Sequence, residues 1–309
     1  MKVESHNNGQ GRLSPQDLGR ACVYGAGLSF LATAFGKPLL SSVVAEVGFV
    51  VIAWLVVTRR KLPAEEAFMV RRAKAGSLAF PIILALGIQS ASSLVLMLVD
   101  FLLGGNLSEA MTRVIGSAIS PGFLAQLVLL GVVAPLSEEL FYRGFGLYCF
   151  RDWGQGWAVI LPSAIFALYH GPLGVAYAFV LGFSAALLVL KTASLWPAIV
   201  LHGAANLCVL GLDAIHSRVH GVFPGLPEWL PCVVVRVAGL VPLLAFRSDV
   251  RDLWTRAVKT FRSLRQDELL GQRFKTLFAS WSYVVLVVFF ALSFTLTAVV
   301  ILAPDLVPF

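Results

Sequence analysis

The residues best suited to chemistry lie in one short stretch, 134–145, which reads APLSEELFYRGF. Glu139 and Arg143 are four residues apart, so on a helix they share a face and can form an ion pair. Glu138 lies five residues before Arg143, which places it roughly 140° from Arg143 around the same helix. It therefore cannot share the ion pair with Arg143. A carboxylate without a salt bridge in an apolar setting has the properties of a general base.

Two further polar motifs occur downstream, each with a four-residue spacing. FALYH ends at His170, and HGAAN runs from His202 to Asn206. Glu138, His170 and Asn206 each lie thirteen residues from the inner end of their helix, and His202 lies one turn shallower. The depth of all four is therefore roughly 14–20 Å. Chance polar residues have no reason to agree in depth, so we expect these side chains to form one site.

The segments that carry these motifs are strongly apolar. Hydrophobic residues make up 58% of the 309 residues and charged residues only 13%, whereas a soluble domain carries roughly a quarter charged residues. A spanning helix needs about twenty apolar residues. Nine segments are candidates, of which the first, fifth and sixth are short or rich in Gly and Pro: 19–36, 38–58, 76–103, 118–150, 156–171, 172–190, 194–212, 229–246 and 277–303. We expect an all-α, polytopic transmembrane helical bundle of about eight or nine spans, forming one integral membrane domain over 1–309.

The basic residues orient this bundle. If all nine segments span, most of the 24 Lys and Arg residues fall in loops on one side. Cytoplasmic loops carry such an excess, which predicts a multi-pass protein of the cell membrane with its N-terminus cytoplasmic and its C-terminus outside. Topology then explains the net charge of +7, so no nucleic acid partner is expected. The four cysteines show no CxxC spacing and indicate neither a disulfide framework nor a zinc cluster.

Residues 247–276 differ from the rest of the chain. Apolar residues recur there at helical spacing with Arg and Lys between them, which predicts a basic amphipathic helix at the inner membrane interface. A solvated linker is the alternative.

Arg236 is an arginine inside a predicted span but outside the three motifs. It and Glu46 each lie about eight residues from the outer end of their span. Since an intramembrane arginine is costly without a partner, we expect the two to pair. The alternatives are that Arg236 reaches the outer headgroups or holds an anionic group of a substrate.

In order and spacing, the three motifs resemble those of the CPBP (CAAX protease and bacteriocin-processing) intramembrane proteases. These are also called ABI proteins and are related to the type II CAAX prenyl endopeptidases. The motifs read Glu138-Glu139-x-x-x-Arg143, Phe166-x-x-x-His170 and His202-x-x-x-Asn206. The resemblance covers 118–212, the expected catalytic core. Residues 247–276 and the last span, 277–303, lie outside it as additions.

The resemblance implies an intramembrane endopeptidase in membrane lipid, acting on a membrane-associated or lipidated protein or peptide substrate. Glu138 would activate the attacking water, and His170 would hold and polarise it. His202 and Asn206 would stabilise the oxyanion, a task worth about 3–4 kcal/mol per good donor.

The remaining motif residues, Glu139 and Arg143, would act as the supporting ion pair. No cofactor is expected. A zinc-dependent protease stays open as an alternative, and its ligands would be Glu138, Glu139, His170 and His202. Against it, the chain has no HExxH, and asparagine is a poor zinc ligand.

Two functions without proteolysis also stay open. A non-catalytic family member acting as a membrane scaffold or immunity factor would be expected to have lost motif residues, and none is lost. A transporter or proton relay would show a helix pattern repeated between the two halves of the chain, and none is apparent.

Overall fold

Each apolar segment forms helix where the structure describes it. The structure, a computed structural model, describes residues 11–34, 38–102, 104, 123–223, 225–227 and 229–302. Over these residues it contains helices and turns and no strand, which confirms the all-α expectation. The predicted segment ends at 36, 103, 118 and 303 lie outside the described residues.

Fourteen α-helices and five tighter or wider helical turns make up the described chain. The α-helices are α1 Pro15–Thr33, α2 Pro38–Arg59, α3 Ala64–Ala67, α4 Ala79–Leu102, α6 Phe123–Val128, α7 Ala134–Glu139, α8 Leu147–Cys149, α9 Gln155–Tyr169, α10 Gly171–Thr192, α11 Trp196–Val222, α12 Trp229–Leu240, α13 Arg247–Arg265, α14 Leu270–Phe278 and α15 Trp281–Leu302. The π-helical turns are η2 Leu129–Val133 and η3 Leu140–Gly146. The 3-10 turns are η1 Ala75–Leu78, η4 Arg151–Trp153 and η5 Val241–Phe246.

Proline marks where several of these helices begin. It stands in the first turn of α1, α7, α10 and α11, where its missing N–H removes no helical hydrogen bond. At α7 this residue is Pro135, which leaves the Gly131 carbonyl in η2 without its usual α-helical donor. A π-helical turn before α7 is consistent with that loss.

Several helical runs are long and apolar enough to cross a membrane, and the chain is a multi-pass membrane protein. Five runs in the described part of the chain meet this standard: Leu40–Arg59, Ala75–Leu102, Gly171–Thr192, Trp229–Arg265 and Trp281–Ala298. The helix α9 has 15 residues, which is about 22 Å and less than the roughly 30 Å of a bilayer core. The count of eight or nine spans stays a prediction.

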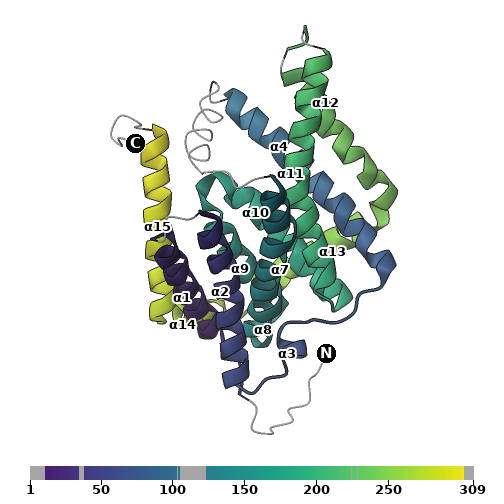
Figure 1. Cartoon of the computed structure of the whole chain (residues 1–309). Helices are drawn as coiled ribbons and strands as arrows, with labels where there is room; N and C mark the ends of the chain where they lie inside the picture. Colours follow the sequence, from purple (N-terminus) through teal and green to yellow (C-terminus); the bar gives the residue numbers. More distant parts are fainter. Residues whose placement is uncertain are drawn as a thin grey trace.

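The helices that carry the polar motifs lie in the middle of the bundle (Figure 1). There α7, α9, α10 and α11 pack together, with α1, α2 and α15 on one side and α4, α12 and α13 on the other. The buried core includes Phe141, Phe145 and Phe166, whose side chains are fully buried. The motif residues therefore project from central helices, where their positions are fixed on all sides by packing.

Residues 247–276 form α13 and most of α14, and these helices are attached to the core by polar contacts. Lys191, near the end of α10, forms ion pairs of 3.0 Å with both Asp249 and Asp252 of α13. The Trp157 indole of α9 donates a hydrogen bond to Asp267, between α13 and α14. These contacts hold the basic segment against one end of the core, and its placement at a membrane interface stays a prediction.

Candidate active site

Glu139 and Arg143 form a buried ion pair, as their four-residue spacing predicts. Nη1 of Arg143 lies 3.0 Å from Oε1 of Glu139, and each side chain is 1% exposed. The guanidinium also donates through Nε to the Gly182 carbonyl at 3.3 Å and lies 4.2 Å from the centre of the Phe166 ring. Glycine is needed at 182 because a Cβ atom there would lie 2.1 Å from Nη2 of Arg143. The arginine is therefore held by three separate elements.

His202 of α11 lies between the two glutamates. Its Nδ1 is 2.8 Å from Oε1 of Glu139, and its Nε2 is 3.5 Å from Oε2 of Glu138. A carboxylate oxygen only accepts hydrogen bonds, so Nδ1 of His202 carries the hydrogen. Oε1 of Glu139 thus accepts from both His202 and Arg143, which leaves Nε2 of His202 directed at Glu138.

Glu138 and His170 line one cavity of about 230 Å³. Aromatic rings make up much of its wall, including those of Phe49, Tyr142 and Tyr169. The side chain of Glu138 is 21% exposed, whereas that of Glu139 is 1% exposed. The two adjacent glutamates therefore occupy different environments, one in an ion pair and the other at a cavity.

His170 stands at the junction of α9 and α10. Its Nδ1 is 2.9 Å from the Phe166 carbonyl, which can only accept, so Nδ1 carries a hydrogen. In the neutral ring the lone pair is then at Nε2. Gly171 follows with φ +68°, a backbone conformation that glycine adopts without strain, and it allows α10 to start directly after His170.

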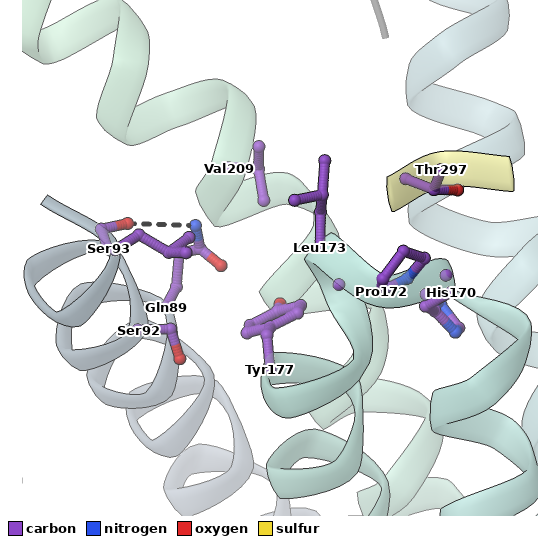
Figure 2. Close-up of a pocket in the computed structure, with 12 residues that line it drawn as sticks. Gln89, Ser92, Ser93, His170, Pro172, Leu173, Tyr177, Val209 and Thr297 are labelled. Carbon is purple, nitrogen blue, oxygen red and sulfur yellow. Dashed lines mark hydrogen bonds between the residues drawn. The ribbon is translucent and has the colours of Figure 1, made fainter. Parts of the chain in front are cut away.

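A second cavity, of about 330 Å³, lies at the same histidine. Figure 2 shows His170, Pro172 and Leu173 on one wall and Gln89, Ser92 and Ser93 of α4 on the other, with Tyr177 between them. Because His170 lines both cavities, this second cavity adjoins the cavity of Glu138.

Asn206 lies one turn beyond His202 on α11 but does not line the Glu138 cavity. Its Nδ2 donates to the Leu130 carbonyl at 2.9 Å. Leu130 belongs to the π-helical turn η2, so Asn206 attaches α11 to the turn that precedes the glutamates. The structure therefore brings Glu138, His170 and His202 together, and places Asn206 beside them with one amide hydrogen already engaged.

Glu46 of α2 is a site residue that the sequence analysis missed. It lines the cavity of Glu138 and His170, and its Oε2 atom is buried with no hydrogen-bond partner among the described residues. A signal was present in the sequence. Glu46 lies thirteen residues before Arg59, just as Glu138 lies thirteen residues before Arg151, so both share one depth when counted from the inner side.

The predicted pair of Glu46 and Arg236 is wrong. Nη1 of Arg236 donates to the Leu212 carbonyl at 3.0 Å, while Glu46 lines a cavity together with Glu138. The reason is lateral position. The helix α2 packs on α1 and α7, whereas α12 packs on α4 and α11, so equal depth from the outer side did not make the two helices neighbours.

The zinc alternative needs a group of metal-coordinating side chains. Among the residues that the structure describes, no three His, Cys, Asp or Glu side chains are grouped so that they could hold a metal ion.

Comparison with known proteins gives one match. Residues 120–208 match the family described as type II CAAX prenyl endopeptidase Rce1-like. No curated protein and no solved structure matches the chain. The matched residues include all three polar motifs, from Glu138 to Asn206. This part of the chain is therefore similar to a CAAX-type family of peptidases.

Proposed function

We propose that this protein is an intramembrane endopeptidase that hydrolyses a peptide bond of a membrane-associated protein or peptide. One observation carries the proposal. Of two adjacent glutamates, Glu139 is occupied by Arg143 and His202, while Glu138 meets His170 at a cavity. A carboxylate and an imidazole that share a cavity can together bind and deprotonate a water molecule.

The proposed reaction begins with a water molecule between Glu138 and His170. His170 orients the water through the lone pair at Nε2, and Glu138 accepts a proton as the water oxygen attacks the carbonyl carbon of the scissile amide. Collapse of the tetrahedral intermediate breaks the C–N bond. Glu138 then returns its proton to the departing amine nitrogen, so the base of the first step is the acid of the second.

The negative oxygen of the intermediate needs hydrogen-bond donors. We assign these donors to His202 and Asn206, since each has a nitrogen or an N–H that its structural hydrogen bonds do not use. Nε2 of His202 lies beside Glu138, and a proton there makes it a donor. Asn206 uses Nδ2 for the Leu130 carbonyl, but that nitrogen carries a second hydrogen. Removing one good donor of this kind costs about 10²–10³ in kcat.

The substrate class belongs to the same proposal. The substrate is drawn from proteins with prenylated C-termini, bacteriocin leaders or membrane-anchored sorting tails, and the large apolar surface of the bundle suits any of these.

The orientation in the membrane is also part of the proposal. The basic loops place the N-terminus in the cytoplasm and the C-terminus outside. Labelling of cysteines introduced near each end, in intact cells, tests that orientation.

The function is tested by comparing three forms of the chain in cells and then in proteoliposomes. Glu138→Gln keeps the size of the side chain but cannot accept a proton. Glu66→Gln is the matched control, because Glu66 is half-exposed and pairs with Arg151 at 3.2 Å, away from the cavity. Mass spectrometry should find peptides cleaved with wild type and with Glu66→Gln, and absent with Glu138→Gln.

The other outcomes each reject a stated idea. Wild-type turnover by Glu138→Gln would remove Glu138 from the mechanism. If no peptide depends on the wild-type protein, the scaffold or immunity-factor alternative takes the place of proteolysis.

A further inference from the structure

The hydroxyl group of Tyr177, on α10, is buried without a partner. Its oxygen makes no hydrogen bond among the described residues. Two other tyrosines use this group within the fold. Tyr169 donates to the Cys22 carbonyl at 2.9 Å, and Tyr283 donates to the Pro15 carbonyl at 2.7 Å. Buried polar groups are normally hydrogen-bonded because an unpaired one costs free energy, so the hydroxyl at 177 needs a reason outside the fold.

Tyr177 lines the 330 Å³ cavity that also contacts His170 (Figure 2). Opposite it, α4 contributes the amide of Gln89 and the hydroxyl groups of Ser92 and Ser93. Nε2 of Gln89 donates to Oγ of Ser93 at 3.4 Å, a long contact within one helix. This bond leaves a second amide hydrogen and the carbonyl oxygen of Gln89 for a ligand. Hydrogen-bonding groups from two helices therefore line the same cavity.

A more apolar cavity of about 460 Å³ adjoins this one. The two cavities share the residues Ser92, Leu96, Leu173 and Tyr177. The wall of the apolar cavity includes Val95 of α4 and Val180 of α10, which are 59% and 47% exposed. Both helices belong to runs that are long and apolar enough to span a membrane. The two cavities together therefore extend from His170 to the surface of two candidate spans.

The cavities select for an uncharged ligand. Among the described residues that line them, none is Lys, Arg, Asp or Glu. Gln89 lies ten residues into α4, about 15 Å along the helix. A polar residue at that depth commonly joins two helices, but the amide of Gln89 bonds to its own helix. Since an unpaired charge is costly in such a space, the fitting ligand is apolar and neutral, with hydrogen-bonding groups along it.

An unwound apolar peptide segment has this chemistry. A spanning helix satisfies its own N–H and C=O groups, and a segment that unwinds so that it can be cleaved loses those bonds. The freed groups are costly in an apolar medium unless the enzyme supplies partners. A tyrosine hydroxyl donates, and a glutamine amide both donates and accepts, so the two side chains can replace the lost helical bonds.

Resting on the proposed function, we propose that these two cavities bind an uncharged, apolar segment of the substrate next to the scissile bond. Tyr177 donates its hydroxyl hydrogen to a backbone carbonyl of the extended segment, and the Gln89 amide bonds to a neighbouring peptide group. The apolar cavity takes a side chain of the same segment. The site thus favours an internal, neutral stretch of a membrane-anchored protein over a segment that ends there in a free carboxylate.

Stability separates this role from a structural one. Tyr177→Phe removes a hydroxyl group that the fold does not use, so its resistance to unfolding by sodium dodecyl sulfate should equal or exceed that of wild type. Tyr283→Phe is the matched control, because it removes a hydroxyl group that is bonded to the Pro15 carbonyl. The control should be less stable than wild type. A loss of stability in Tyr177→Phe as large as that in Tyr283→Phe overturns the proposal.

Binding is measured with a fluorescently labelled trileucine peptide that ends in an amide, by fluorescence anisotropy in detergent micelles. All proteins in this assay carry Glu138→Gln, so that the probe stays intact. Tyr177→Phe should weaken binding about 3–10-fold, as expected for the loss of one neutral hydrogen bond, and Gln89→Leu at least as much. Tyr283→Phe should bind as the parent does. The same peptide ending in a free carboxylate should bind at least about tenfold more weakly.

The remaining outcomes distinguish this inference from the proposed function. Equal binding by Tyr177→Phe and Tyr283→Phe overturns the inference, as does tighter binding of the carboxylate form or no saturable binding of the amide form. If the amide peptide binds as expected but no peptide in cells depends on the wild-type protein for cleavage, the subsite stands and the proteolytic function fails. If cleavage occurs and Tyr177→Phe leaves its KM unchanged, the subsite fails and the proteolytic function stands.

Discussion

Replacement of Gly182 by alanine tests how firmly Arg143 is held. In most helix interiors Gly→Ala stabilises by about 1 kcal/mol, because glycine loses more backbone entropy on folding. At position 182 the new Cβ atom would lie 2.1 Å from Nη2 of Arg143 and 2.9 Å from a ring carbon of Phe166. Neither group has room to move away freely, because the guanidinium is bound by Glu139 and stacked on Phe166.

The expected magnitude follows from these contacts. Overpacking a filled interior costs typically about 1–3 kcal/mol, and breaking a buried ion pair by displacing one partner costs about 3–5 kcal/mol. Partial displacement of Arg143, set against the helix-propensity gain, gives a net loss of about 2–4 kcal/mol in the free energy of unfolding. The sign is thus opposite to that of an ordinary Gly→Ala change.

The assay is unfolding of the purified protein in mixed micelles with increasing sodium dodecyl sulfate, followed by circular dichroism. Gly211→Ala is the matched control, because Gly211 lies inside α11 and a Cβ atom there meets nothing within 4 Å. The control should be neutral or more stable than wild type. If Gly182→Ala matches the control in stability and keeps full activity, the guanidinium is not confined as described.

Three further changes test other contacts. Glu139→Ala removes the common acceptor of Arg143 and His202, which should cost about 3–5 kcal/mol and lower activity; normal stability of the variant in the same unfolding assay would contradict the buried pair. Chelators should not inhibit proteolysis reversibly, and elemental analysis should find less than one zinc per chain; one zinc per chain that is required for activity would establish the zinc alternative. Desolvation alone would raise the pKa of Asp267, but hydrogen bonds from the Trp157 indole and the Leu269 N–H, with the charge of Arg273, hold that pKa below its usual value. The stabilisation from Asp267 is therefore present above its usual pKa of about 3.9 and lost as pH falls through the lower folded-state value. On acidification, wild type should lose its advantage in stability over Asp267→Asn. Curves of unfolding free energy against pH that run parallel for the two proteins would rule the contact out.

Periodicity along a single helix was enough to predict much of this protein. The pairing of Glu139 with Arg143 depends only on the geometry of one turn, and it is present. The all-α class and the positions of the helices follow from long apolar runs, because these satisfy both the bilayer and the backbone. These features need no knowledge of which helices become neighbours.

Contacts between helices could not be predicted in this way. Depth was compared for Glu46 and Arg236 from the outer side, but depth says nothing about lateral position, and the two residues lie on helices with different neighbours. The need for glycine at 182 depends on an arginine 39 residues earlier in the chain. Likewise, the four-residue spacing of His202 and Asn206 gave their shared face but not their partners, Glu139 and the Leu130 carbonyl.

The π-helical turn η2 gives this domain a way to lose its site without losing a single motif residue. A π-helical turn holds one residue more than an α-helical turn, and each residue of an α-helix advances the direction of its side chains by roughly 100°. Deleting one residue from Leu129–Val133 would rotate α6 and Glu138 against each other by about that angle. Composition, charge and every motif spacing from Glu138 onward would survive. The rotational phase of this one turn therefore sets the direction in which Glu138 faces relative to α6, independently of the motif residues themselves.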